Sequence, residues 1–280
     1  MKIKLHIDGR EYEATLPDGW EGLTRKEWRA LLLLRGSVKV KREIERSAPN
    51  ALIYYEREVI TGIELISYTQ VLAALKVLTG WPAKQAMYMT PEACAMAAQE
   101  MPWCVLKHSH AKSYMPRVGM WLGPKQMLGN LTWERYALAE EALRGWGEAA
   151  QGADEKAMRK KERSLYAVLY APMGYWKPWI GRVNMLLAHV VRRHTLTNCL
   201  MNYSGMREAV MEVYDRVFNG PKGGQQRADQ MRRLTIALSG TKFGDMRHTR
   251  TENVHNVLAY LTMMEEERIE RERAAAARKK

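Results

Sequence analysis

The chain has 280 residues, a mass of 32.3 kDa and a net charge of +13, a size that suits one large domain or two small ones. Hydrophobic residues make up 46% of the sequence, yet no apolar run reaches the roughly 18–20 residues that cross a bilayer. The N-terminus alternates in polarity and lacks the apolar block of a signal peptide. We therefore expect no membrane span and a location in the cytoplasm of the cell that makes the protein.

The net charge and the cysteine content bear on the possible binding partners and on the redox compartment of the protein. An excess of basic residues attracts nucleic acid, an acidic protein surface or an anionic membrane face, and the charge alone does not select among them. Cys94, Cys104 and Cys199 are too few and too irregularly spaced for a disulfide framework. We interpret them as small buried hydrophobes in a reducing compartment.

The N-terminal third begins with a hairpin and a helix. Residues 2–15 alternate around Asp8 and Gly9, a preferred turn pair, and predict a β-hairpin. Thr24 and Glu27 have the spacing of a capping box, which predicts a helix from residue 24 to about 35. Further helices are expected over 49–60, over 67–78 with a second capping box of Ser67 and Gln70, and over 90–100 after the Thr-Pro-Glu start at 90–92.

The middle of the chain changes character twice. Between residues 102 and 124 aromatic and β-branched residues stand among polar ones without a helical period, which predicts a short strand insertion near 103–121. A helix is expected from Thr132 to about residue 146. The stretch 147–157 is rich in Gly and Ala, and we interpret it as a linker.

The C-terminal half is predicted to be helical. Helices are expected from about 159 to 170, over 180–194, 204–218 and 225–238, and from 251 onward, with a basic loop at 239–250. Residues 265–273 are almost wholly charged, so this end should project into solvent, fray or await a partner. The predicted fold is α+β and predominantly α-helical, divided into an N-terminal hairpin plus helical domain (1–146), a linker (147–157), a helical domain (158–264) and a charged tail (265–280).

No constellation of residues predicts an enzyme. Cys104, His108 and His110 come nearest to metal-ligand spacing, but a structural zinc site needs four ligands in paired short spacings, so we interpret them as part of an exposed polar strand. The glycine-rich stretches at 220–224 and 240–242 lack the order of a phosphate-binding loop. We therefore predict no catalytic residue, no metal and no cofactor.

The candidate sites are surfaces. The aromatic residues Tyr175, Trp176 and Trp179 either stack nucleic-acid bases or plug one end of a helical core, and we favour the core because such rings are usually buried. Val254, Leu258 and Leu261 form a helix face that can pack against a second copy or a partner. A basic stripe can contact phosphates or be a solvated face; its members are Arg227, Arg232, Arg233, Lys242, Arg247 and Arg250.

A short sequence motif occurs twice, each time at a predicted helix start. In it a Leu-Thr pair is followed four residues after the Thr by an aromatic residue: Leu23-Thr24 with Trp28, and Leu131-Thr132 with Tyr136. Together with WEGLT at 20–24, LGP at 122–124, LTWERYALAE at 131–140 and NVHNVLAYL at 253–261, it resembles tailed-bacteriophage and prophage morphogenesis proteins. The closest type is the tail assembly chaperone, which is encoded near the tape-measure protein. Residues 155–250 carry little of the resemblance.

The resemblance implies a non-enzymatic assembly protein that keeps a tape-measure protein or unassembled tail subunits in solution. Its expected partners are other phage structural or tail proteins, acting in the host cytoplasm. Two alternatives stay open: a structural virion component, such as a connector or tail-completion protein, and a basic nucleic-acid-binding accessory protein. A homo-oligomer is compatible with each of these functions.

Overall fold

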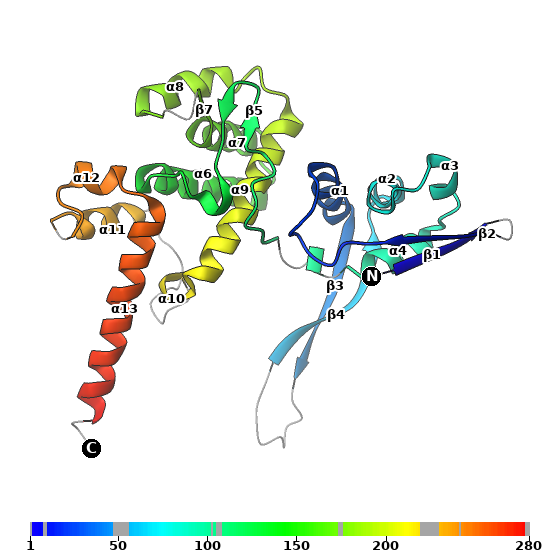
Figure 1. The fold of residues 1–280 in the computed structure, drawn as a ribbon, viewed down its shortest axis with the longest axis horizontal. Helices are drawn as coiled ribbons and strands as arrows, with labels where there is room; N and C mark the ends of the chain where they lie inside the picture. Colours follow the sequence, from blue (N-terminus) through cyan, green and yellow to red (C-terminus); the bar gives the residue numbers. More distant parts are fainter. Residues whose placement is uncertain are drawn as a thin grey trace. The chain divides into compact units, whose positions relative to one another are not determined.

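The structure is a computed structural model that describes residues 2–7, 10–46, 56–101, 103–104, 108–172, 176–218, 230–240 and 242–277. The chain divides into two compact units, Met1–His108 and Ser109–Lys280. Each unit combines helices with short antiparallel strands, and helix predominates, so the predicted fold class is confirmed (Figure 1). No helix within these ranges is both long and apolar enough to cross a membrane.

The first unit begins with the predicted hairpin. Its elements are β1 (Lys2–Ile7), β2 (Arg10–Thr15), α1 (Arg25–Gly36), β3 (Val38–Arg46), β4 (Glu56–Leu65), α2 (Tyr68–Thr79), α3 (Ala83–Ala86) and α4 (Pro91–Gln99). Strands β1 and β2 pair antiparallel, with Ile3 opposite Ala14. The predicted turn residues Asp8 and Gly9 lie outside the described residues.

Local capping chemistry sets the helix starts. The Thr24 hydroxyl accepts from the Glu27 backbone N–H at 3.3 Å, and the Glu27 carboxylate accepts from the Thr24 N–H at 2.7 Å, so the predicted capping box is confirmed. The Thr90 hydroxyl caps α4 in the same way. The second expected box is wrong, because Gln70 instead accepts a hydrogen bond from Ser37 at 2.7 Å.

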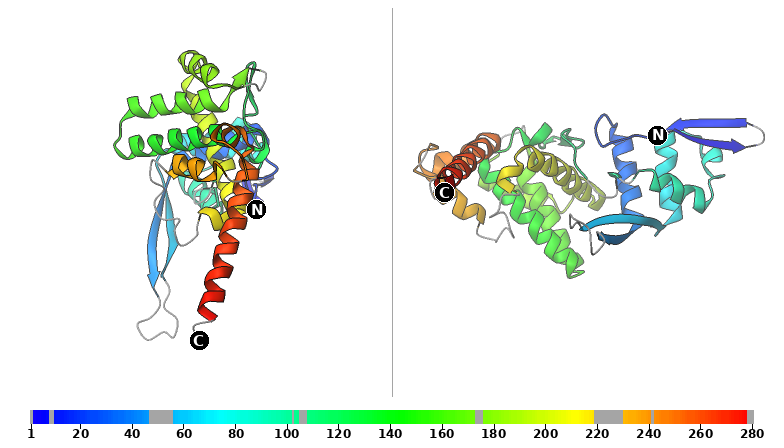
Figure 2. Two further views of the ribbon diagram at one scale, coloured as in Figure 1. Left: turned by 90° about the vertical axis from the view of Figure 1, so that its left-hand side faces the viewer. Right: turned by 90° about the horizontal axis from the view of Figure 1, so that it is seen from below.

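A long two-stranded ribbon occupies part of the segment for which a helix over 49–60 was expected. Residues 56–60 belong to β4, which pairs antiparallel with β3 along its whole length, and residues 47–55 lie outside the described residues. The helical expectation was wrong for 56–60 because a partner strand from 38–46 supplies backbone hydrogen bonds that no local pattern reveals. In Figure 2 the ribbon extends beyond the helices of its own unit.

The core of the first unit lies between α1 and α2. Trp28, Leu31 and Leu34 of α1 are fully buried, as are Val71 and Leu75 of α2. Burying a side chain of this size contributes about 1.5–3 kcal/mol, so each of these residues contributes to the stability of the unit.

The second unit contains the longer helices. Its elements are β5 (Arg117–Val118), β6 (Trp121–Leu122), η1 (Gln126–Leu128), α6 (Trp133–Gln151), α7 (Glu155–Leu169), β7 (Ala171–Pro172), α8 (Pro178–Leu187), α9 (Arg193–Val213), α10 (Asp215–Phe218), α11 (Gln230–Leu238), α12 (Met246–Thr251) and α13 (Val254–Ala277). The predicted strand insertion is shorter than expected: β5 and β6 form a hairpin, and β7 pairs with β6.

The stretch interpreted as a linker, 147–157, is part of a helical hairpin. Its first five residues complete α6, and Asp154 caps α7 by accepting from the Ala157 N–H at 3.0 Å. Helices α6 and α7 lie side by side (Figure 1). The chain therefore does not divide at 147–157, because only Gly152 and Ala153 form a turn there and the helices on both sides pack within one unit.

A buried polar network joins α6 to α9. The Arg207 Nε lies 2.7 and 2.8 Å from the two carboxylate oxygens of Glu140, and the Tyr203 hydroxyl donates to Glu140 Oε1 at 2.8 Å. The Tyr136 hydroxyl is also buried beside Glu140, but it has no hydrogen-bond partner within the described residues. Burial raises the pKa of both phenols well above the ordinary value.

The C-terminal helices differ from expectation in their limits. The apolar helix expected over 180–194 is interrupted by a turn at 188–192, which separates α8 from α9. The expected basic loop at 239–250 contains α12. The charged segment from 265 stays helical to Ala277, because pairs such as Arg268–Glu265 and Arg271–Glu267 have helical spacing. Figure 2 shows α13 extending past its neighbours in this unit.

Candidate interaction surface

The residues considered as metal ligands are buried rather than exposed. His108 and His110 are 6% and 1% exposed, and Cys104 is fully buried, so their interpretation as an exposed polar strand was wrong. The His110 Nδ1 lies 2.7 Å from the Lys112 carbonyl oxygen. Within the described ranges no three His, Cys, Asp or Glu side chains gather closely enough to hold a metal ion. Burial raises the pKa of the Cys94 and Cys104 thiols, to about 11 and about 12.

The aromatic candidates divide between the body of the unit and its surface. Trp176 is half-buried; its indole N–H donates to the Ala167 carbonyl at 3.3 Å, and the Arg135 guanidinium lies 5.7 Å from its ring centre. Trp179, one residue into α8, is 60% exposed. Tyr175 lies outside the described residues. Of these three candidates, Trp179 is therefore the described aromatic whose ring is mostly exposed.

Four further apolar side chains share the exposed side of α8 with Trp179. Their exposed fractions are 44% for Val183, 73% for Leu186, 38% for Leu187 and 82% for Val190. Side chains three, four, seven or eight positions apart share a helix face, so Trp179, Val183, Leu186 and Leu187 lie on one face of α8. Val190 is exposed in the turn that follows the helix. We call these five residues the α8 stripe.

The opposite side of α8 fixes the direction in which the stripe points. Ile180, Asn184 and Ala188 are buried. The Asn184 amide donates to the Tyr170 carbonyl at 2.5 Å, and its oxygen accepts from the Trp121 indole N–H at 3.2 Å. Because these directional contacts hold the rotation of the helix about its axis, the α8 stripe faces solvent as a consequence of the fold.

Cations border the α8 stripe. Lys177, Arg182 and Arg192 are exposed, at the start, within and just beyond the helix. The sequence contains no Asp or Glu between Glu162 and Glu208. The surface therefore combines exposed apolar side chains with exposed basic ones.

The candidate face on α13 packs largely against other residues of the same chain. Val254 and Leu258 are buried, and Leu261 is half-buried. The first turn of α13 is held against the start of α6, since the Val254 N–H donates to the Leu131 carbonyl at 3.1 Å. This intramolecular packing was not visible in the helical pattern, and it withdraws Val254 and Leu258 from any partner.

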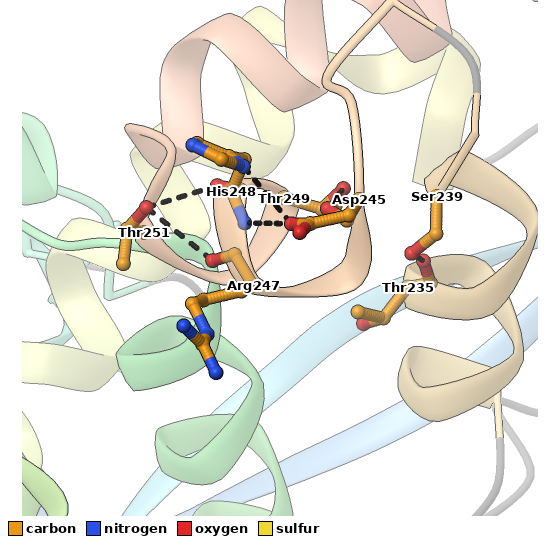
Figure 3. Close-up of polar contacts among 7 residues, drawn as sticks. All are labelled: Thr235, Ser239, Asp245, Arg247, His248, Thr249 and Thr251. Atoms are coloured by element: carbon orange, nitrogen blue, oxygen red, sulfur yellow. Dashed lines mark hydrogen bonds and ion pairs between the residues drawn. The ribbon is translucent and has the colours of Figure 1, made fainter.

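The basic candidates that the structure describes lie on α11, α12 and the turn between them. Arg233, Lys242, Arg247 and Arg250 are exposed, Arg232 lies in α11, and Arg227 lies outside the described residues. In Figure 3 the Arg247 side chain points away from Asp245, whose carboxylate caps α12 by accepting from the His248 N–H at 2.8 Å. The hydrogen bonds from the His248 backbone and side chain lower the pKa of Asp245. The region can attract an anion, and the structure adds no second feature that selects one.

Sequence reasoning missed Val183, Leu186, Leu187 and Val190. The sequence predicted one continuous helix over 180–194 and assigned none of these side chains to a surface. The signal that could have found them is the length of that apolar run, which exceeds what one buried face of a helix needs.

Comparison with known proteins adds no family: no family model matches the chain, and no curated protein or solved structure shows significant similarity to it.

Proposed function

We propose that the protein is a non-enzymatic assembly protein that holds another protein on the α8 stripe. The observation that carries this proposal is the exposure of four apolar side chains on a helix whose rotation is fixed by buried contacts, with a fifth, Val190, exposed just beyond its end. An exposed row of this kind costs solubility unless a partner covers it, and such rows mark protein–protein sites.

The resemblance of residues 131–140 and 253–261 to phage morphogenesis proteins supplies the context of the proposal. In that context the partner is a tape-measure protein or an unassembled tail subunit, and the protein acts in the host cytoplasm while the tail is built. A structural virion component would use the same surface but remain in the finished particle. Mass spectrometry of purified particles separates these two: absence of the protein supports a chaperone, and its presence supports a virion component.

The experiment that tests the proposal is an affinity capture with a matched control. The tagged protein is co-expressed with the proteins encoded by the genes next to its own and washed at low and high salt. Val183→Asp with Leu186→Asp places two carboxylates within the α8 stripe, and Met120→Asp places one at an exposed apolar side chain on the β5–β6 turn. Circular dichroism checks that all three proteins fold alike.

We expect a protein partner that survives the high-salt wash, is lost with the double variant and is retained by Met120→Asp. Recovery of nucleic acid alone, lost at high salt, would contradict the proposal. It would instead support the basic residues of α11 and α12 as a nucleic-acid site, because phosphate contacts weaken steeply with salt. In that case Arg247→Glu with Arg250→Glu should abolish the recovery.

A further inference from the structure

We propose that the exposed face of α7, together with the start of α9, binds the phosphate backbone of a double-stranded nucleic acid without reading its sequence. The residues that carry this inference are cations, and we call them the α7 basic cluster: Lys156, Arg159, Lys160 and Arg163 of α7 and Arg193 of α9. The inference goes beyond the proposed function, because it adds a second kind of partner and uses no residue of the α8 stripe.

The α7 members of the cluster share one face of the helix. They stand three, four and seven positions after the first of them, a spacing that brings side chains together on a helix surface: Lys156, Arg159, Lys160 and Arg163. Over this distance the helix rises about 10 Å, at about 1.5 Å per residue. Three of these cations line a surface hollow of about 380 Å³ together with Glu155. The cluster therefore surrounds one place on the surface.

Glu155 is the carboxylate that lines this hollow, and two cations share it. The Arg159 guanidinium lies 3.1 Å from Glu155 Oε2, and the Arg193 guanidinium lies 3.8 Å from the same oxygen. This contact also ties the start of α9 to α7, which pack against each other (Figure 1). Glu162, the other carboxylate of residues 155–163, is buried. One exposed carboxylate between two guanidinium groups leaves a positive charge in excess.

The other three cations of the cluster add to this excess. Lys156 and Lys160 are exposed and Arg163 is half-buried, and none of the three forms an ion pair with another described residue. The Arg163 Nε is also buried without a hydrogen-bond partner in the described part of the chain. Phosphate oxygens suit such a group, because a guanidinium binds them through two parallel hydrogen bonds and a lysine binds them as a point charge.

The surface around the cluster favours a nucleic acid over a protein or a membrane. Protein interfaces have an apolar centre, and helices that lie on a bilayer bury an apolar face. Residues 139–172 are all described, and no large apolar side chain among them is exposed. A row of phosphates, in contrast, needs only cations to bind it.

The same stretch favours a double strand over a single strand. Proteins that bind single strands stack the bases on accessible aromatic rings. The aromatic rings of residues 139–172 are half-buried in the case of Trp146 and buried in the cases of Tyr166 and Tyr170. A duplex keeps its bases stacked inside and presents its phosphates outside, so contacts to the backbone alone hold it and carry no sequence information.

The experiment measures binding of the full chain to a labelled duplex of about 20 base pairs by fluorescence anisotropy at several salt concentrations. A single strand of the same length, polyglutamate and vesicles containing an anionic lipid are the other probes. Lys156→Gln with Lys160→Gln removes two charges from the cluster. Arg247→Gln with Arg250→Gln removes the same charge from exposed residues of α12, and circular dichroism checks that all three proteins fold alike.

We expect duplexes of different sequence to bind alike, with an affinity that falls more than about a hundredfold between about 50 and 200 mM salt if four or five cations meet phosphates. Lys156→Gln/Lys160→Gln should weaken binding about fivefold or more and should reduce the slope of log affinity against log salt by about 2, because each lost phosphate contact removes about 1. Arg247→Gln/Arg250→Gln should leave the affinity within about twofold, since a general effect of net charge would be equal in the two variants.

Equal weakening by the two double variants would overturn the inference, because the binding would then follow net charge and not the α7 basic cluster. Tighter binding of the single strand than of the duplex would also overturn it. Binding of polyglutamate or of vesicles without binding of the duplex would do the same, as would the absence of binding to any probe.

Discussion

Two buried tyrosines beside Glu140 should respond in opposite ways to loss of the hydroxyl. Tyr203→Phe removes a donor that lies 2.8 Å from Glu140 Oε1, in a network that also holds Arg207. Tyr136→Phe removes a hydroxyl that is buried but has no partner in the described part of the chain. The two substitutions delete the same atom from equally buried rings, so each serves as the control for the other.

The magnitudes follow from the hydrogen bond and from its absence. A hydrogen bond to a charged group contributes about 1.5–3 kcal/mol, so Tyr203→Phe should lower the free energy of unfolding by about 2 kcal/mol. For a unit of this size that is a fall of about 4–8 °C in Tm. Tyr136→Phe should leave the free energy of unfolding within about 0.5 kcal/mol or raise it, because a buried unsatisfied hydroxyl costs stability.

Urea unfolding followed by circular dichroism, with calorimetry to separate the two units, measures both values. A loss of equal size for the two variants would refute the assignment of the hydrogen bond to Tyr203 alone. A loss for Tyr136→Phe with none for Tyr203→Phe would reverse the roles of the two rings around Glu140. Either result would show that the network between α6 and α9 is arranged differently.

Two further predictions concern the same unit. A Cβ at Gly123 would lie 2.4 Å from Tyr170 Cε1 and 2.9 Å from the Met115 carbonyl oxygen, so Gly123→Ala should lower the urea midpoint markedly. A Cβ at Gly145 in α6 would meet only the flexible end of Lys161, so Gly145→Ala should leave the free energy of unfolding unchanged or raise it by up to about 1 kcal/mol through higher helix propensity. Burial raises the pKa of Glu162, so its ionised form destabilises the fold above that pKa. Glu162→Gln should therefore raise Tm at neutral pH, and the gain should shrink as the pH falls through the folded-state pKa; a gain that grows on acidification would contradict this.

The sequence by itself determined the features that depend on neighbouring residues. The hairpin at 2–15 and the starts of α1, α4 and α6 were predicted correctly, because alternation and capping are local: a Thr hydroxyl reaches a backbone N–H three residues ahead whatever surrounds it. The predominance of helix followed from the same local periodicity.

Tertiary structure decided what depends on distant parts of the chain. Residues 56–60 are strand because 38–46 pairs with them, and 147–157 contains the end of α6, a short turn and the start of α7 because these two helices pack together. Val254 and Leu258 are core because the start of α6 lies against them. The α8 stripe faces solvent because Asn184 binds the Tyr170 carbonyl and fixes which side of the helix is buried, a choice that apolar residues all around a helix leave undecided.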